Sequence, residues 1–130
     1  MKSIIIDTNF LMIPSKFRVD IFSEFNRICN FNYKLHILDK SIGELKNIIE
    51  RQPGKDKKAA QLALKLVRLK NIGIIKSSDG DVDSLILKRA GKDTIVATQD
   101  MQLKHELQKK GASVIILRQK KYLELFRKGL

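Results

Sequence analysis

The sequence has few of the residues that build cross-links or soft-metal sites. Its single cysteine, Cys29, excludes an internal disulfide framework and a cysteine-based zinc site. Its two histidines, His36 and His105, are too few for a histidine-rich metal centre. No apolar run approaches the ~20 residues that a membrane-spanning helix requires. The first such run, Ile4–Ile6, ends at Asp7, which is too early for a signal peptide. We therefore expect a soluble cytoplasmic protein that does not associate with a membrane.

Acidic residues are also scarce, and the chain is strongly basic as a result. The 130 residues include 26 lysines and arginines but only 14 aspartates and glutamates, which gives a formal net charge of +12. Residues 51–70 carry a local charge of +6 and residues 118–128 one of +4. Such an excess suits a polyanion, most often nucleic acid, although a lysine-rich helix is also commonly a solvated surface. The candidate RNA-binding residues are Lys55, Lys57, Lys58, Arg118, Lys120 and Lys121.

The end of the chain combines positive charge with aromatic side chains. Length and composition predict a single domain over residues 1–130, with a basic C-terminal tail at about residues 118–130. In this tail Tyr122 follows two lysines, and such a ring can stack on a base while the cations meet phosphates. The alternative is that Tyr122, Leu123 and Phe126 form an apolar helical face that packs on the domain or on a second subunit in a homodimer.

Short β-branched runs alternate with longer segments of helical period. Apolar residues recur at helix spacing around residues 21–29, 42–49, 59–69, 85–90 and 103–107. The intervening runs are almost continuously apolar, which is typical of parallel strands covered on both faces. We therefore predict a three-layer α/β/α sandwich with a central five-stranded parallel sheet. The five predicted strands are residues 4–6, 34–38, 73–76, 94–98 and 113–117.

Acidic side chains recur where the predicted strands end. In a doubly wound sheet, the carboxyl ends of the strands and the N-termini of the following helices share one edge, and ligands bind there. Seven of the 14 acids map to this edge: Asp7, Asp39, Glu44, Asp79, Asp81, Asp83 and Asp100. Carboxylates gathered in a crevice repel one another unless a cation compensates. Mg²⁺ or Mn²⁺ prefers oxygen ligands and also accepts phosphate oxygens, which suits phosphodiester hydrolysis.

Helix capping is the alternative explanation for several of these acids. Ser41 and Glu44 have the spacing of a capping box, and Asp81 and Asp83 suit an N-cap and a first helical turn. Asp7 is different, because an acid directly after a buried strand is costly without a partner. The joint placement of the acids therefore carries more weight than any one of them.

Four short motifs, in order, resemble the PIN-domain nuclease family. The first is Ile4–Asn9, in which a strand runs into Asp-Thr-Asn. The second is Ser41–Leu45, which contains a glutamate at the start of the next βα unit. The third is Asp83–Ile86, where serine replaces the second acid of the family's Asp-Asp-x-Ile pattern. The fourth is Ala97–Asp100, where glutamine precedes the acid.

The resemblance implies an endoribonuclease that depends on Mg²⁺ or Mn²⁺. In the family mechanism a metal-activated water attacks the phosphate in line, leaving a 5′-phosphate and a 3′-hydroxyl. The resemblance implies that the catalytic metal ligands are Asp7, Glu44, Asp83 and Asp100, with Asp81 as an outer ligand. It also implies that Thr8, Asn9 and Thr98 orient water or substrate. Residues 7–14 and 118–122 are most similar to the archaeal relatives of PIN endonucleases that process small-subunit ribosomal RNA.

Three functions remain open on the sequence alone. The first is a metal-dependent endoribonuclease, in ribosomal RNA processing or as the toxin of a toxin–antitoxin pair, although no antitoxin partner is indicated. The second is a non-catalytic RNA-binding or ribosome-assembly module in which the acids only cap helices. The third is a phosphoacceptor receiver domain, but receivers carry an acid pair by the first strand and this chain has Asp7 alone. We favour the endoribonuclease.

Overall fold

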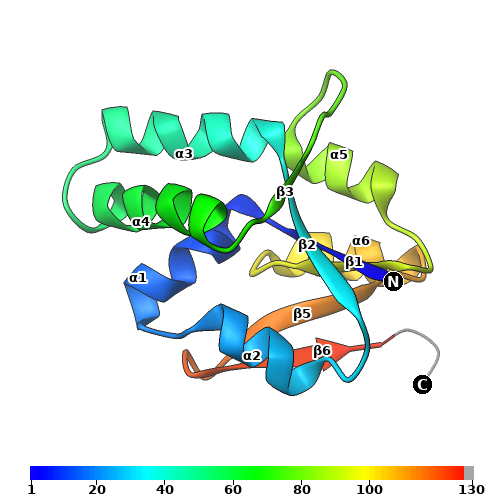
Figure 1. Cartoon of the computed structure of the whole chain (residues 1–130). Helices are drawn as coiled ribbons and strands as arrows, with labels where there is room; N and C mark the ends of the chain where they lie inside the picture. The colour runs from blue at the N-terminus through cyan, green and yellow to red at the C-terminus, as the bar shows by residue number, and fades with distance from the viewer. Residues whose placement is uncertain (128–130) are drawn as a thin grey trace.

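A six-stranded sheet forms the centre of the computed structural model, which describes residues 1–127, and helices cover both of its faces (Figure 1). The strands are β1 (Lys2–Ile6), β2 (Tyr33–Leu38), β3 (Gly73–Ile75), β4 (Thr94–Ala97), β5 (Ser113–Arg118) and β6 (Tyr122–Phe126). The helices are the 3₁₀ turn η1 (Thr8–Met12), α1 (Ile13–Phe17), α2 (Ile21–Ile28), α3 (Asp39–Arg51), α4 (Lys55–Leu69), α5 (Val82–Arg89) and α6 (Met101–Lys109). Within residues 1–127, none of the helices has the length and apolar character needed to cross a membrane.

The strand order places a topological switch point in the middle of the sheet. The order is β3-β2-β1-β4-β5-β6, and β1 to β5 are mutually parallel. From β1 the chain builds outward through β2 and β3, and it then returns to build the other half through β4 and β5. The two halves meet between β1 and β4, where Ile6 pairs with Ala97 at the carboxyl ends of both strands. In sheets of this kind, ligands bind in the crevice at such a point.

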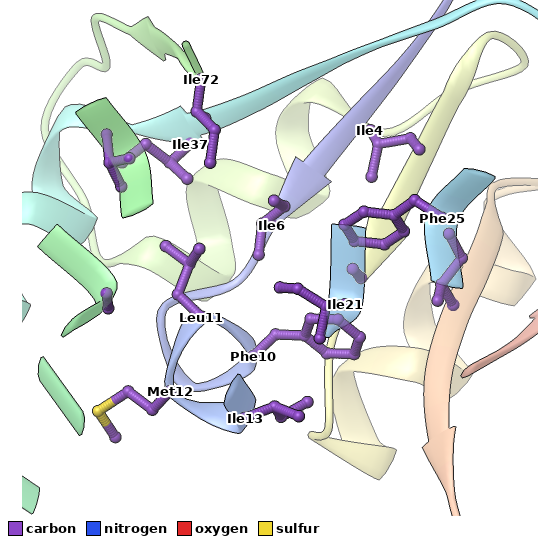
Figure 2. Close-up of a cluster of buried hydrophobic side chains, with 14 of the residues drawn as sticks. Ile4, Ile6, Phe10, Leu11, Met12, Ile13, Ile21, Phe25, Ile37 and Ile72 are labelled. Atoms are coloured by element: carbon purple, nitrogen blue, oxygen red, sulfur yellow. The ribbon is translucent and has the colours of Figure 1, made fainter. Parts of the chain in front are cut away.

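The apolar strands are buried on both sides, as their composition predicts. Ile4 and Ile6 of β1 belong to the larger core cluster, whereas Ile5 belongs to the smaller one on the opposite face. The larger core lies under η1 and α1–α4, and in it the rings of Phe10 and Phe25 stack with their centroids 6.2 Å apart (Figure 2). The smaller core lies under α5 and α6. Burial on both faces explains why the strands lack an apolar/polar alternation.

The prediction of a parallel α/β sandwich is confirmed, but the predicted count of five strands is wrong, because the sheet has a sixth strand. Residues 122–126 form β6, which pairs antiparallel with β5. The chain reverses in a tight turn closed by a 2.9 Å hydrogen bond from the Lys121 amide to the Arg118 carbonyl. Gln119 and Lys120 both adopt left-handed backbone conformations there, with φ of 51° and 56°. Such turns usually contain glycine or asparagine, so this one has no turn signature in the sequence. The end of the predicted tail, residues 128–130, lies outside the described residues.

The apolar side chains of β6 do not form the helical face that was considered for them. Leu123 is 1% exposed and joins the larger core, whereas Phe126 packs against the smaller core on the other side of the sheet. The outer edge of β6 is held by α2, because Glu24 accepts a 2.8 Å hydrogen bond from the Leu123 amide. Arg27 pairs with Glu24 and donates a 3.0 Å hydrogen bond to the Leu123 carbonyl. These contacts attach the last strand to the domain.

Replacing Gln119 tests the strain in the turn. Glycine tolerates a φ of 51° without the steric cost of a Cβ, so Gln119→Gly should raise the free energy of unfolding by about 1 kcal/mol. Gln119→Ala shortens the side chain but keeps the Cβ, so this matched variant should give no gain. Urea denaturation followed by circular dichroism measures both. Equal stability of the two variants would contradict the assignment of strain to this residue.

Candidate active site

A pocket of about 470 Å³ lies at the switch point, and carboxylates dominate its lining. Asp7 directly follows β1, and Asp100 lies just beyond β4. Glu44 reaches the pocket from α3, and Asp81 and Asp83 reach it from the start of α5. The structure therefore brings together the four predicted catalytic acids and the predicted outer ligand. The other lining residues are Thr8, Asn9, Asn47, Ile48 and Val82.

Asp7 is the most buried of the five acids, with 5% of its surface exposed. Its Oδ1 accepts a 2.8 Å hydrogen bond from the Thr8 amide, and its Oδ2 accepts one of 2.8 Å from the Thr98 hydroxyl. Burial raises the pKa of Asp7 above its ordinary value, and the negative charges of Glu44 and Asp100 raise it further. The two hydrogen bonds act in the opposite direction. The balance leaves a carboxylate that is costly to ionise without a compensating cation.

A chain of buried hydroxyl groups holds the second acid. The Thr8 hydroxyl lies 2.8 Å from the Ser41 hydroxyl and also bonds to Glu44 Oε1. A hydroxyl has one proton, so Thr8 donates to the Glu44 carboxylate and accepts from Ser41. Thr8 and Ser41 are 3% and 0% exposed, which keeps water from competing for these bonds. This arrangement directs the Glu44 side chain toward the pocket.

The capping-box interpretation of Ser41 and Glu44 is wrong. Helix α3 begins at Asp39, and its N-cap, Leu38, makes no side-chain capping bond. Ser41 therefore lies inside the helix, and Glu44 lies in its second turn. A capping box would have needed Ser41 to precede the helix. Glu44 therefore does not cap the N-terminus of α3.

Asp81 and Asp100 act as helix caps and also line the pocket. Asp100 Oδ1 accepts hydrogen bonds from the amides of Gln102 and Leu103 at the start of α6. Asp81 Oδ1 accepts a 2.8 Å hydrogen bond from the Ser84 amide at the start of α5. Each bond uses a single carboxylate oxygen, so capping does not exclude a second interaction for the same side chain. The capping interpretation is confirmed for Asp81.

The pKa values of the two acids at the start of α5 are shifted in opposite directions. The hydrogen bonds from Ser84 lower the pKa of Asp81. Burial raises the pKa of Asp83, and the charges of Asp7 and Asp100 raise it further. The influence of Asp7 and Asp100 on Asp83 shows that the three carboxylates share one electrostatic environment across the pocket.

Some residues at this edge differ from the sequence-based interpretation. Asp39 bonds to the Ser77 hydroxyl, and neither Asp39 nor Asp79 lines the pocket. Ser41 and Asn47 were not predicted as site residues. Both are three residues from Glu44 on the same helix, which places each of them next to Glu44 on the helix surface. That spacing is the signal by which they could have been found.

The donor set fits a hard divalent cation. The pocket presents carboxylate and amide oxygens and contains no histidine or cysteine, which is the ligand chemistry that Mg²⁺ and Mn²⁺ prefer. The pKa values of Asp7 and Asp83 are raised first by burial and then by the charges of neighbouring carboxylates, and a cation in the pocket would offset both effects. Within residues 1–127, however, no group of three or more His, Cys, Asp or Glu side chains is drawn together closely enough to hold an ion.

The predicted RNA-binding cations lie outside this pocket. Arg118 forms an ion pair with Glu124 across the β5–β6 hairpin, with a 3.3 Å separation. The Lys120 ammonium lies 5.9 Å from the centroid of the Phe17 ring. Lys55 and Lys58 line a separate hollow. Lys57 and Lys121 are exposed, and they line neither the carboxylate pocket nor the hollow that contains Lys55 and Lys58.

A mostly parallel sheet with a carboxylate-lined pocket at its switch point defines a doubly wound α/β domain with an acidic site. The chain belongs to the PIN-like domain family, because the family model described as "PIN like domain" matches residues 4–120. The family resemblance noted in the sequence is thereby confirmed.

Individual relatives agree with this assignment. Ribonuclease VapC4 of Methanocaldococcus jannaschii is 32% identical over 128 residues, which are 97% of this chain and 98% of that protein. The structure of the PIN domain endonuclease Utp24 matches with a TM-score of 0.78 at 21% identity, covering 98% of this chain and 95% of that one. A domain of a functionally unknown protein from Methanocaldococcus jannaschii matches with a TM-score of 0.59 at 16% identity, covering 91% and 92%. The two structural likenesses confirm the fold.

Substituting Asp7 tests the electrostatics of the pocket in metal-free protein. Folding raises the pKa of Asp7 above 3.8, so its ionisation costs folding free energy. The free energy of unfolding of the wild type should therefore fall as the pH rises from about 3.8 through the raised pKa of Asp7, and it should level off at higher pH. Asp7→Asn cannot ionise, so its melting temperature relative to wild type should rise over the same window.

Melting curves in EDTA between about pH 4 and about pH 8 measure this difference. Asp79→Asn is the matched control, because Asp79 is an exposed acid at the same edge that does not line the pocket. Its melting temperature relative to wild type should change little with pH. A pH-independent difference for Asp7→Asn would show that the pocket does not penalise the charge.

Proposed function

We propose that this protein is a Mg²⁺- or Mn²⁺-dependent endoribonuclease that hydrolyses RNA phosphodiester bonds. The observation that carries the proposal is the convergence of five carboxylates, from four separate segments of a PIN-like fold, on one pocket at the switch point. The 32% identity to a protein named as a ribonuclease, over almost the whole chain, supports RNA as the substrate. The net charge of +12 suits a polyanionic substrate as well.

The metal would be held by Asp7, Glu44, Asp83 and Asp100, with Asp81 as an outer ligand. When bound, the ion would offset the mutual repulsion of these carboxylates, neutralise charge on the scissile phosphate and lower the pKa of a bound water. Asp7 and Asp83 fit this role, because burial raises the pKa of each and neighbouring carboxylates raise it further, and a bound cation would offset both effects. A bound cation would favour the ionised form of both acids.

The neighbouring polar residues fall into two groups. The hydroxyls of Thr8 and Thr98 donate to Glu44 and Asp7, so we assign both threonines to orienting carboxylates. Such outer contacts fix the direction of a ligand and tune its basicity. Asn9 is exposed and lines the pocket, so its amide is free to contact the substrate. Asn47 is also exposed at the pocket and offers a second amide.

A nuclease assay with two charge-neutralising variants tests the catalytic assignment. Asp7→Asn and Glu44→Gln should each fold and lose at least about 100-fold of the cleavage rate on single-stranded RNA, because each removes a charged oxygen ligand. Glutamine still accepts the hydrogen bond from Thr8, so Glu44→Gln leaves the local structure intact. Titration of Mg²⁺ and of Mn²⁺ against the cleavage rate measures the metal requirement, with EDTA abolishing activity.

The matched control is Glu50→Gln, which makes the same chemical change at an exposed position of the same helix. This variant should cleave RNA at the wild-type rate. Near-normal turnover by Glu44→Gln would remove Glu44 from the metal site. Wild-type cleavage that persists in EDTA would overturn the metal dependence.

We further propose that the protein acts in the processing of small-subunit ribosomal RNA, which residues 7–14 and 118–122 support by resemblance. A toxin-type ribonuclease is the second candidate, since the sequence also resembles the toxin nucleases of the same family. The proposed processing enzyme should cut a precursor of small-subunit ribosomal RNA at one discrete position in vitro and leave the growth of an expressing bacterial host unchanged. Growth arrest by the wild type, relieved in Asp7→Asn, would favour the toxin instead.

A further inference from the structure

Two further hollows lie in a row between the carboxylate pocket and a cluster of cations. The first is lined by Asn9, Met12, Lys16, Phe17, Gln99 and Asp100, and it shares Asn9 and Asp100 with the carboxylate pocket. The second is lined by Ser15, Lys16, Arg18, Lys55 and Lys58, and it shares Lys16 with the first. The shared residues place the three hollows next to one another, and we call this row of hollows the α1 groove because residues of α1 line both additional hollows.

The sign of the charge reverses along the α1 groove. Carboxylates line its inner end, and four of the five residues that line its outer end are cations. The nearby acid Asp56 forms a 2.7 Å ion pair with Lys16, and both partners remain partly exposed. The ion pair neutralises Lys16, so Arg18, Lys55 and Lys58 leave the outer end positively charged.

The local backbone explains why these cations gather. Helix α1 ends at Phe17, and the following residue, Arg18, is its C-cap and adopts a left-handed conformation with φ of 55°. Helix α4 begins at Lys55, directly after Gly54, whose φ is 67°. The two helices pack against each other, which brings the last residues of α1 beside the first turn of α4. The cations therefore come from two rigid elements on the same side of the molecule.

The middle of the α1 groove is less charged and contains an aromatic ring. Phe17 is half-buried there, and Met12 lies beside it as a further apolar lining residue. The ammonium of Lys120, in the β5–β6 turn, lies 5.9 Å from the centre of the Phe17 ring. A ring flanked by cations is the combination with which proteins hold single-stranded RNA, because rings contact bases while cations contact phosphates.

We propose that single-stranded RNA runs from the carboxylate pocket along the α1 groove, where Arg18, Lys55 and Lys58 contact phosphates neighbouring the one that is cleaved. This inference rests on the proposed ribonuclease function for the inner end of the groove. An anionic strand entering a carboxylate pocket needs cations on its adjacent phosphates, and the α1 groove presents them in the adjoining hollows. A further basic hollow, lined in part by Lys76 and Lys88, shares no lining residue with the carboxylate pocket.

That unconnected hollow supplies a control of equal charge. The groove variant is Arg18→Gln with Lys58→Gln, and the control variant is Lys76→Gln with Lys88→Gln. All four residues are exposed, so both double variants should fold, and melting curves verify this. Each variant removes two positive charges, so a difference between them reports position and not net charge.

Binding is measured without metal, with a 5′-fluorescein-labelled oligouridylate of about 12 nucleotides in EDTA. Each phosphate contact contributes about 0.7 to the slope of log affinity against log salt, so the groove variant should lower the slope by about 1.4. This corresponds to roughly 25-fold weaker binding near 0.1 M salt. The control variant should weaken binding less than about threefold. Equal losses in the two variants would overturn the proposal.

Catalysis supplies a second readout that a structural defect would not reproduce. With Mn²⁺, the groove variant should raise KM for the oligouridylate while kcat stays near the wild-type value. Bis(p-nitrophenyl) phosphate is too short to reach the outer cations, so both variants should hydrolyse it at the wild-type rate. Loss of this small-substrate activity in the groove variant would overturn the proposal.

The binding experiment tests the RNA path and the cleavage experiment tests the ribonuclease function, so either proposal can be contradicted without the other. If the wild type cleaves no RNA while the groove variant still loses affinity, the ribonuclease function is wrong and the binding path stands. If the wild type cleaves RNA while both double variants bind it equally, the binding path is wrong and the ribonuclease function stands.

Discussion

Burial of the Asp7 carboxylate at the end of β1 is the constraint on which the rest of the site depends. A nearly inaccessible acid needs donors, and here the Thr8 amide and the Thr98 hydroxyl provide them. Thr98 lies at the end of β4, so its bond also ties together the two halves of the sheet at the switch point. The hydrogen bond from Thr8 to Glu44 then extends the same network into α3. The hydrogen bonds that start at Asp7 thus link the ends of β1 and β4 and, through Thr8, helix α3 around the pocket.

Helix capping and site formation are two uses of the same acids at one edge of the sheet. A helix that follows a parallel strand starts at this edge, and its first amides need acceptors. Asp81 and Asp100 satisfy those amides with one carboxylate oxygen each. The charge that stabilises the helix start also adds to the field of the pocket. The sequence-based alternatives of cap or ligand therefore describe compatible roles for one residue.

The sequence predicted those parts of the molecule that depend on strong local patterns. The buried apolar runs predicted β1 to β5. The positions of Asp7 and Asp100 just beyond two of these runs predicted that both acids line the pocket. The sequence did not reveal β6, because Gln119 and Lys120 hold a left-handed turn without a characteristic turn residue. It also misassigned Ser41, whose hydroxyl serves a tertiary contact with Thr8 that no local pattern encodes. The errors fall where long-range packing overrides local preference.

The attachment of β6 to α2 has a consequence for self-association. An edge strand normally offers unpaired amide and carbonyl groups to a strand from another chain. At Leu123 both groups already bond to side chains of one ion pair, Glu24 and Arg27. An incoming strand would have to break that ion pair before it added a rung to the sheet. The opposite edge is β3, only three residues long. The fold thereby resists edge-to-edge growth of the sheet.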